Sequence, residues 1–382
     1  MDKEVARKPI KIFALASFLN DLGSDMIYPI WPLFVTSVLG ANMAVLGFID
    51  GLGEAIVSIS QAASGYISDK MRKRKVFIWV GYLCGSVSRV GYALSTTWQY
   101  LIPFRILDRA GKIRAAPRDA IVADISTNEN RGRNFGLIRA MDNLGAVCGI
   151  IVCILFVELL GYRNLFLIAA IPSTISSLLI FALIKEKTAT GNIYKGFSLK
   201  NLDKNFKLFL LLSSFFALGS FSYSFLLVYA KELGFQVTFI PVLYLVFTLT
   251  ASISSLPFGK LSDKIGRKQV LLLSYICWGL VAYSFIFIQI YWVIILTFVL
   301  YGLHKGMLEP VQRTLVSELT PVEYRASGLG LFQMVVGLCA LPSSLIAGIL
   351  WDRINIFMPF YFSLSLTILS IIMLMFVREK RL

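Results

Sequence analysis

The chain has 382 residues, of which 57% are hydrophobic and only 15% are charged, and its mean hydropathy is +0.73. A soluble domain of this length carries more charge, so the composition excludes that class and indicates a polytopic membrane protein. The formal net charge of +15 would suit a nucleic-acid partner, but most Lys and Arg residues lie in connections between apolar runs. That placement indicates membrane topology and contact with anionic lipid, and we expect no nucleic acid as a partner.

A membrane-spanning helix needs about 20 residues, and twelve segments are candidates. They lie near residues 12–39, 44–67, 76–95, 98–125, 134–158, 165–184, 207–230, 238–261, 270–288, 291–318, 327–350 and 357–377. The fourth is rich in charge and is predicted because its counterpart in the second half, 291–318, is mostly apolar. We therefore predict an N-terminal six-helix bundle (1–184), a polar cytoplasmic linker (185–206) and a C-terminal six-helix bundle (207–382), with both basic termini in the cytoplasm.

A short motif occurs twice, at an offset of about 194 residues, which indicates an internal duplication. Residues 65–74 (GYISDKMRKR) recur as residues 259–268 (GKLSDKIGRK), and residues 124–131 (DISTNENR) match residues 318–325 (ELTPVEYR). In each copy of the first motif a long apolar run ends, a basic cluster follows and another apolar run begins. This pattern predicts a tight cytoplasmic turn between two membrane helices.

Twelve spans in two halves, a long central loop and this doubled motif resemble the major facilitator superfamily (MFS). The resemblance covers essentially the whole chain; one departure is Arg72, which stands where the family has Gly. It implies an all-α fold of two pseudo-symmetric six-helix bundles, and a cytoplasmic gate held by the motif residues. Those gate residues are Gly65, Asp69, Lys70, Arg74, Asp124, Arg131, Gly259, Asp263, Lys264, Arg267, Glu318 and Arg325. The alternative is that the basic members only set the topology.

Ionisable side chains inside a bilayer are costly, so those within the apolar runs are candidates for function. Asp21 and Asp25 lie one helical turn apart, and Arg105, Arg109 and Lys112 form a stripe down the fourth helix with Asp108 beside them. The resemblance implies that helices 1, 4, 7 and 10 line a central cavity. The predicted substrate-binding and coupling residues are Asp21, Asp25, Glu54, Arg105, Asp108, Arg109, Lys112, His304, Lys305 and Glu309.

Each of these acids has an alternative role in a static salt bridge between helices, and His304 is equally a hydrogen-bonded helix partner or a proton relay. Tyr223, Tyr229, Tyr244 and Tyr301 could form an aromatic wall opposite the charges, with packing as the alternative. The five cysteines lie in apolar runs without metal-ligand spacing, so neither a metal site nor a cofactor is expected.

Two stretches bear on the mode of transport. The run from Arg105 to Gly111 partly resembles a pattern of proton-coupled antiporters, and the run from Asn20 to Pro32 resembles drug exporters. The antiporter signature in the fifth helix begins at Gly145 and Gly149, but Ile150 replaces its proline.

We therefore expect a monomeric secondary transporter in a prokaryotic inner or plasma membrane. It would move a small organic solute by alternating access with proton coupling, and efflux is favoured. The alternatives are uptake or facilitated transport of an anionic or zwitterionic metabolite, a fold-sharing sensor, and a membrane-embedded lipid-acting enzyme. The enzyme has least support because the chain holds one histidine and no nucleophile–histidine pair, and no nucleotide-binding loop is present.

Overall fold

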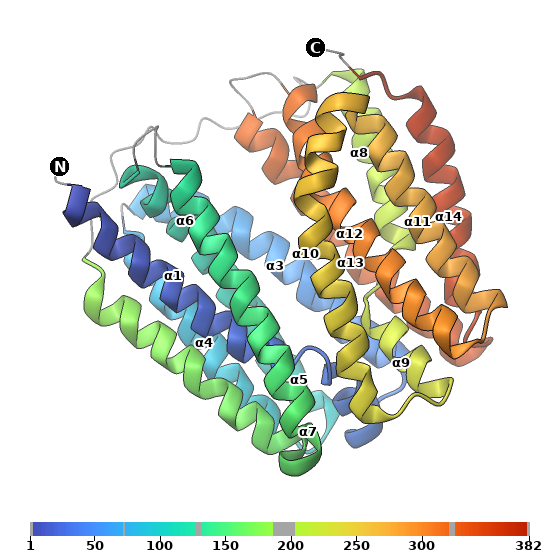
Figure 1. Cartoon of the computed structure of the whole chain (residues 1–382), viewed down its shortest axis with the longest axis horizontal. Coiled ribbons are helices and arrows are strands. Elements are labelled where there is room, and N and C mark those ends of the chain that lie inside the picture. The colour runs from blue at the N-terminus through green and yellow to red at the C-terminus, as the bar shows by residue number, and fades with distance from the viewer. Residues whose placement is uncertain (1–2, 72, 127–130, 186–202, 321–324, 380–382) are drawn as a thin grey trace. The chain divides into compact units, whose positions relative to one another are not determined.

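The computed structural model describes residues 3–71, 73–126, 131–185, 203–320 and 325–379 (Figure 1), and within these ranges the regular structure is entirely helical. The first half forms α1 (Lys3–Asp25), α2 (Trp31–Leu33), the π-helix η1 (Phe34–Val38), α3 (Met43–Met71), α4 (Lys75–Leu94), α5 (Trp98–Ala110), the 3-10 helix η2 (Gly111–Arg114), α6 (Ala115–Asp124) and α7 (Arg131–Leu183). The second half forms α8 (Lys204–Gly219), α9 (Ser224–Glu232), the 3-10 helix η4 (Val237–Phe239), α10 (Ile240–Ile265), α11 (Arg267–Phe287), α12 (Tyr291–Leu319), α13 (Arg325–Arg353) and α14 (Met358–Phe376).

Eight helical stretches of the described chain are long and apolar enough to cross a membrane. One of them, Arg133–Leu183, contains two spans, because Gly161 (φ 69°, ψ 170°) turns the chain where only glycine adopts the conformation without strain. The three further predicted spans are less apolar or interrupted: α1 with α2 and η1, α4 with its buried Arg89, and α5 with η2 and α6. Together the described helices account for the twelve predicted spans.

The chain divides into two compact units, which differ from the predicted halves in one respect. The first unit comprises Met1–Gly40 and Ile56–Lys195, and the second comprises Ala41–Ala55 and Gly196–Leu382. The beginning of α3 thus belongs to the second unit. Most of the predicted linker, residues 186–202, lies outside the described residues, so the predicted domain boundaries stay a prediction.

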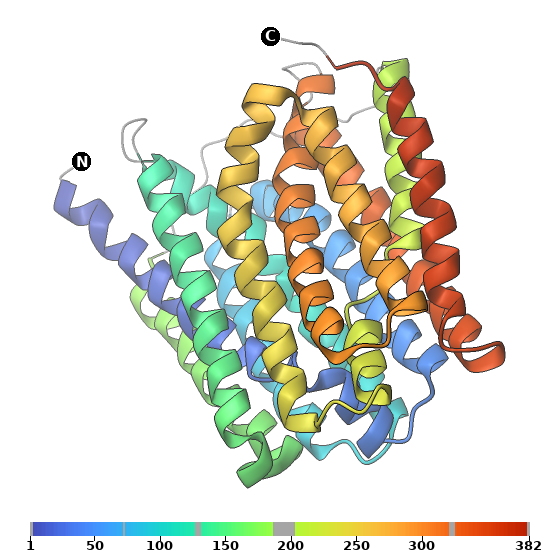
Figure 2. The same cartoon turned by 45° about the vertical axis from the view of Figure 1, so that its right-hand side comes forward.

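Small residues explain why the start of α3 packs in the second unit. A β-carbon on Gly51 would lie 2.7 Å from the carbonyl oxygen of Ala340 on α13, and one on Gly47 would collide with the carbonyl of Ser344. Because lipid chains are as apolar as the side chains, helices in a membrane associate through such close backbone packing. In the same unit α8 packs on α14 and α10 on α12 (Figure 2).

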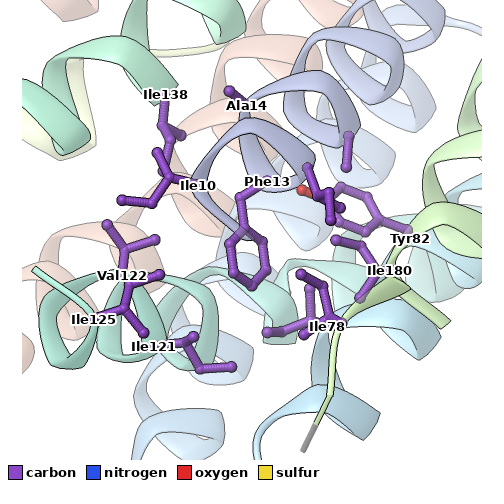
Figure 3. Packing of buried hydrophobic residues seen from close by; sticks show 13 residues of the cluster. Ile10, Phe13, Ala14, Ile78, Tyr82, Ile121, Val122, Ile125, Ile138 and Ile180 are labelled. Atoms are coloured by element: carbon purple, nitrogen blue, oxygen red, sulfur yellow. The ribbon is translucent and has the colours of Figure 1, made fainter. Parts of the chain in front are cut away.

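In the first unit, α1 packs chiefly along α7. Figure 3 shows Ile10 and Phe13 of α1 packed among aliphatic side chains of α4, α6 and α7. Further along α1, the backbone of α7 comes so close that a β-carbon on Gly145 or Gly149 would collide with the carbonyl of Phe18 or Leu22. These contacts orient the polar face of α1, which carries the candidate site.

Candidate functional site

The first membrane-spanning segment is interrupted beside Arg105 and Arg109, two of the predicted site residues. Helix α1 ends at Asp25, turns follow, and the chain continues as α2 and then as the π-helix η1. Pro29 and Pro32 cannot donate the backbone hydrogen bonds of a continuous helix, and π-helical turns often mark functional sites. The break places the rings of Tyr28 and Trp31 beside α5.

Each of these rings carries one guanidinium group. The Cζ atom of Arg105 lies 4.4 Å from the centroid of the Trp31 ring, and that of Arg109 lies 5.1 Å from the Tyr28 ring. Arg109 Nη1 also donates to the Tyr28 hydroxyl at 3.2 Å. Both arginines are buried, and cation–π contact of this kind is strongest when the cation is desolvated.

Asp108 lies among several basic side chains. Arg109 Nε is 3.8 Å from Asp108 Oδ2, and the charges of Arg105 and Lys112 also act on the carboxylate. Lys112 lies in the 3-10 turn of η2, which begins at Gly111. Lys112 itself is half-buried.

Arg89 on α4 is a buried cation that the predicted site did not include. Its guanidinium donates to Ser24 Oγ at 2.7 Å, to the carbonyl of Ala169 at 3.0 Å and to the carbonyl of Asn20 at 3.3 Å. It therefore joins α1, α4 and α7. A single arginine in an otherwise apolar helix was the sequence signal that could have found it.

Gly85, one helical turn before Arg89, lies among polar atoms from three helices. A β-carbon there would be 3.7 Å from Asp108 Oδ1 and 3.9 Å from both Arg89 Nη2 and Asn20 Oδ1. On α1, Asn20 Nδ2 also donates to Asp21 Oδ1 at 2.8 Å, and Asp25 is buried. The predicted first-unit residues Asp21, Asp25, Arg105, Asp108 and Arg109 thus lie on the neighbouring helices α1 and α5.

A second polar group lies further along the fourth span. Arg118 Nη1 donates to Ser17 Oγ at 2.8 Å and lies 3.6 Å from Asp142 Oδ1, while Arg118 Nε contacts Asp119 at 3.1 Å. The guanidinium of Arg114 lies 4.9 Å from the Tyr82 ring centroid. Each of these cations bridges helices, which is the structural role that the sequence left open for its charges.

The second unit holds the remaining predicted site residues in a more aromatic setting. Lys305 Nζ lies 5.7 Å from the centroid of the Tyr301 ring, hydrogen bonds with the Tyr301 hydroxyl and feels the charges of Glu54 and Glu309. Both glutamates are exposed. Whether this group faces Asp25 and Arg109 across a cavity concerns the placement of the two units, so that part of the prediction stays a prediction.

His304 is fully buried and bonded to a neighbouring helix. Its Nδ1 lies 2.9 Å from Ser274 Oγ and 2.9 Å from the Ser274 carbonyl on α11. The ring of Trp278 lies 5.5 Å away, and that of Phe216 lies 5.6 Å away. This geometry fits the alternative of a hydrogen-bonded helix partner.

Among the four tyrosines expected in an aromatic wall, Tyr229 and Tyr301 are buried in packed clusters. Tyr229 donates its hydroxyl to the Phe285 carbonyl at 2.6 Å, and Tyr301 lies 5.0 Å from the Phe247 ring. Tyr223 and Tyr244 stack edge to face at 5.3 Å. These are packing contacts, and packing was the alternative role for these four tyrosines.

The two motif copies form two charge clusters. In the first unit, Arg74 Nη1 lies 2.5 Å from Asp124 Oδ2, and we call this pair the first charge cluster. In the second unit, Arg267 pairs with Asp263, lies 3.2 Å from Glu318 and donates to Ser262 Oγ at 2.8 Å, and we call this group the second charge cluster.

The C-terminal segment contributes a further acid to the second charge cluster. Glu379 accepts from the backbone N–H groups of Arg267 at 2.5 Å and Lys268 at 3.3 Å. Lys268 Nζ in turn donates to the carbonyls of Met375 and Val377, at 2.6 and 3.1 Å. No pattern in the sequence indicates this contact, because Glu379 lies in a charged tail without periodicity.

Several predicted gate residues are not part of the described contacts. The surroundings of Gly65 and the side chains of Asp69, Lys70, Arg131 and Arg325 lie outside what the structure describes. Lys264 is exposed, and a β-carbon on Gly259 would meet no atom within 4 Å, so packing does not require glycine there.

Twelve helical spans in two six-helix bundles with buried charge between the helices define a class, the multi-pass membrane transporters. A model of the Major Facilitator Superfamily matches residues 13–206 and 208–382, and the chain belongs to this superfamily. The resemblance inferred from the doubled motif is thereby confirmed. The family consists of transporters, and no enzymatic activity is indicated.

Individual relatives agree with this assignment. The chain is 40% identical to the uncharacterized MFS-type transporter MJ1317 of Methanocaldococcus jannaschii, over 98% of this chain and 96% of the relative. It is 26% identical to the multi-drug resistance efflux pump PmrA of Streptococcus pneumoniae, over 82% of this chain and 81% of that protein. A crystal structure of the nucleoside transporter NupG superposes with a TM-score of 0.82 at 15% identity, covering 97% of this chain and 100% of NupG.

Proposed function

We propose that this protein is a secondary transporter in which a small organic anion and a proton move together by alternating access. The protein would act in a prokaryotic plasma membrane with both termini in the cytoplasm, and it would need no cofactor. The observation that carries the proposal is the excess of positive charge in the interior of the first unit.

That excess is seen in the fully buried side chains. Among the described spans of the first unit, the buried cations are Arg89, Arg105, Arg109 and Arg114. The acids there are Asp25, which is buried, and Asp108, whose side chain is 12% exposed beside Arg109. Buried charge is costly unless it is compensated, so a site with more cations than acids is complementary to an anionic ligand.

Arg105 and Arg109 are suited to bind such a ligand. A guanidinium group offers several N–H donors in one plane and binds carboxylate or phosphate oxygens in pairs. The rings of Trp31 and Tyr28 lie 4.4 and 5.1 Å from the Cζ atoms of these groups and hold them at the break in the first span. Binding sites in transporters of this kind lie near the middle of the membrane, beside broken helices, as here beside the break after Asp25.

The neighbouring carboxylate of Asp108 provides a physical basis for proton coupling. While Asp108 is ionised, it competes with an anionic solute for Arg109; once it is protonated, it no longer does. Proton and anion therefore bind best together, and an inward proton gradient drives uptake of the anion.

A second candidate is proton-driven efflux of a cationic or neutral drug. The similarity to PmrA and the buried carboxylate of Asp25 favour it. In that mechanism proton and solute compete for the same acid, so the two move in opposite directions.

Proteoliposomes under an imposed pH gradient distinguish the two candidates. Anionic, zwitterionic and cationic solutes are tested separately, and we expect accumulation of an anion on the side to which protons flow. Extrusion of a cation against the proton flow would instead support the second candidate.

Substitutions then test the site itself. Arg105→Ala or Arg109→Ala should lower the initial rate by about 10²-fold, the loss expected for charge-assisted hydrogen bonds to the solute. Arg139→Ala is the matched control, because Arg139 lies in the same unit with its side chain 66% exposed. Full activity of both interior variants, with the protein folded, would remove these arginines from the site.

A further inference from the structure

In the second unit, the seventh predicted span is interrupted, and a buried carboxylate meets the interruption. Helix α8 ends at Gly219 and α9 begins at Ser224. Asp50 of α3 is 3% exposed and lies at the first turn of α9. The predicted site contained its neighbour Glu54 but not Asp50.

One oxygen of Asp50 accepts from both serines at the break. Asp50 Oδ2 lies 2.7 Å from Ser222 Oγ and 2.5 Å from Ser224 Oγ. Ser222 Oγ also accepts from the backbone N–H of Ser224 at 3.2 Å, and Ser344 Oγ on α13 accepts from the N–H of Ser222 at 3.2 Å. The start of α9 is therefore attached to α3 and α13 by these hydrogen bonds, beside the packing of the Phe225 ring against Trp351 of α13.

The charge of Asp50 strengthens this attachment in two ways. Hydrogen bonds to an ionised carboxylate are roughly twice as strong as neutral ones. The N-terminus of α9 carries partial positive charge from its backbone N–H groups, which favours a nearby anion. A protonated Asp50 would lose both contributions and would itself become a donor.

Other charged groups of this unit lie elsewhere along the packed elements. Glu54 follows Asp50 by one turn on α3, and Lys305 and Glu309 on α12 interact near it. The α13 carboxylate of Asp352 is engaged by the backbone N–H groups of Met43 and Ala44, at 3.1 and 2.7 Å. The described charges of α8 and α9 are Lys204 and Lys207 at the start of α8 and Lys231 and Glu232 at the end of α9, away from the break. The tyrosines are Tyr223 at the break, whose ring contacts Tyr244 of α10, and Tyr229 further along α9.

We propose that Asp50 is a proton-binding site of the transport cycle, and that its protonation releases the start of α9 from α3. The inference rests on the proton coupling in the proposed function. Because α3 continues beyond Ala55 into the first unit, this release frees one element shared by both units. The ligand of the site is a proton, which binds to Asp50 as the hydrogen bonds from the two serine hydroxyls break.

The test uses the full chain in lipid nanodiscs and does not depend on transport. Infrared difference spectra between about pH 8 and about pH 5 detect the protonated-carboxyl stretch, and hydrogen exchange followed by mass spectrometry reports on residues 222–227. In the wild type we expect a carboxyl band on acidification. After correction for intrinsic rates, exchange at the start of α9 should rise by about tenfold, as charge-assisted bonds become neutral ones.

Variants assign these signals to the site. Asp50→Asn should weaken the band by the contribution of one carboxyl group and show fast exchange at every pH. Ser222→Ala combined with Ser224→Ala should show fast exchange with the band at full intensity. Asp352→Asn is the matched control, a carboxylate capping a helix in the same unit, and should keep the wild-type pH dependence. A band of unchanged intensity in Asp50→Asn, or pH-dependent exchange that survives in the double serine variant, would overturn the proposal.

Proteoliposomes separate this proposal from the proposed function. Asp50→Asn should lower gradient-driven accumulation by about tenfold and leave solute exchange without a gradient in place. If the wild type shows no coupling at all, the proposed function fails, yet the infrared and exchange results still decide whether Asp50 binds the proton. Wild-type coupling with unchanged accumulation in Asp50→Asn would overturn the role of Asp50 in the cycle.

Discussion

The two units share a helical plan and a loop motif, but their interiors are built from different chemistry. In the described part of the first unit, buried arginines such as Arg89 and Arg105 lie against aromatic rings and carbonyl oxygens. In the described part of the second unit, Phe216 stacks on Tyr275 at 4.0 Å, and the buried charged side chain is that of Asp50. The backbone plan of a duplicated fold therefore does not determine which half carries the polar chemistry.

The two charge clusters show the same divergence on a smaller scale. Arg74 holds Asp124 in the first unit, and its repeat equivalent in the second is Lys268. The partner of Glu318, however, is Arg267, the residue before Lys268. Gly266, with φ 109°, turns the chain before α11, and this turn allows Arg267 to reach Glu318.

The largest effect that follows from this comparison concerns Arg89. Arg89→Ala should lower the free energy of unfolding by about 3 kcal/mol, because three buried oxygens lose a charged donor. Its repeat equivalent, Tyr283, is exposed and contacts Phe287, so Tyr283→Ala should change stability by about 0.5 kcal/mol or less. Thermal unfolding of both variants in the same detergent makes the measurement, and equal shifts would show that the two interiors do not differ as described.

An intermediate effect is expected at the charge clusters. Arg74→Ala and Arg267→Ala should each slow transport by roughly threefold to tenfold, because each removes a part-buried ion pair. The exposed Lys73, repeat equivalent of Arg267, is the control, and Lys73→Ala should leave the rate near that of the wild type. Exchange of the two charges, Arg74→Asp with Asp124→Arg, should restore part of the lost rate; no recovery would mean that the pair does not act through its charge.

The smallest effect is expected at His304. His304→Asn should lower stability by about 1 kcal/mol through the loss of its bonds to Ser274, and pH-driven transport should persist. Uptake assays at several external pH values check this. A folded variant that still binds solute but no longer responds to the pH gradient would make His304 a proton relay after all.

Much of the fold follows from local information. Apolar runs of membrane length and the doubled motif predicted the spans, the duplication and the family, because a bilayer requires every span to satisfy its own backbone hydrogen bonds. The same pattern placed Asp21, Asp25, Arg105 and Arg109 in membrane helices. The pattern did not distinguish these residues from Arg89, because the free-energy cost of placing a charge in a membrane helix applies to all of them.

The partners of those charges could not be predicted from spacing. The packing of Gly47 and Gly51 on α13 brought the start of α3 into the second unit. Asp50 and Glu54 are one turn apart in sequence, yet only Asp50 meets the serines at the α8–α9 break. Such contacts join residues more than 150 positions apart, and no local pattern encodes them.

By itself the amino-acid sequence determined that this protein is a duplicated helical membrane protein of the major facilitator type, since hydropathy, charge placement and repeats are properties of neighbouring residues. Only the tertiary structure decided which buried charges have partners, which aromatic rings support the arginines and where the carboxylate of Asp50 lies. The physical reason is that burial makes each charge depend on a few atoms at hydrogen-bond distance, and the packing of distant helices places those atoms.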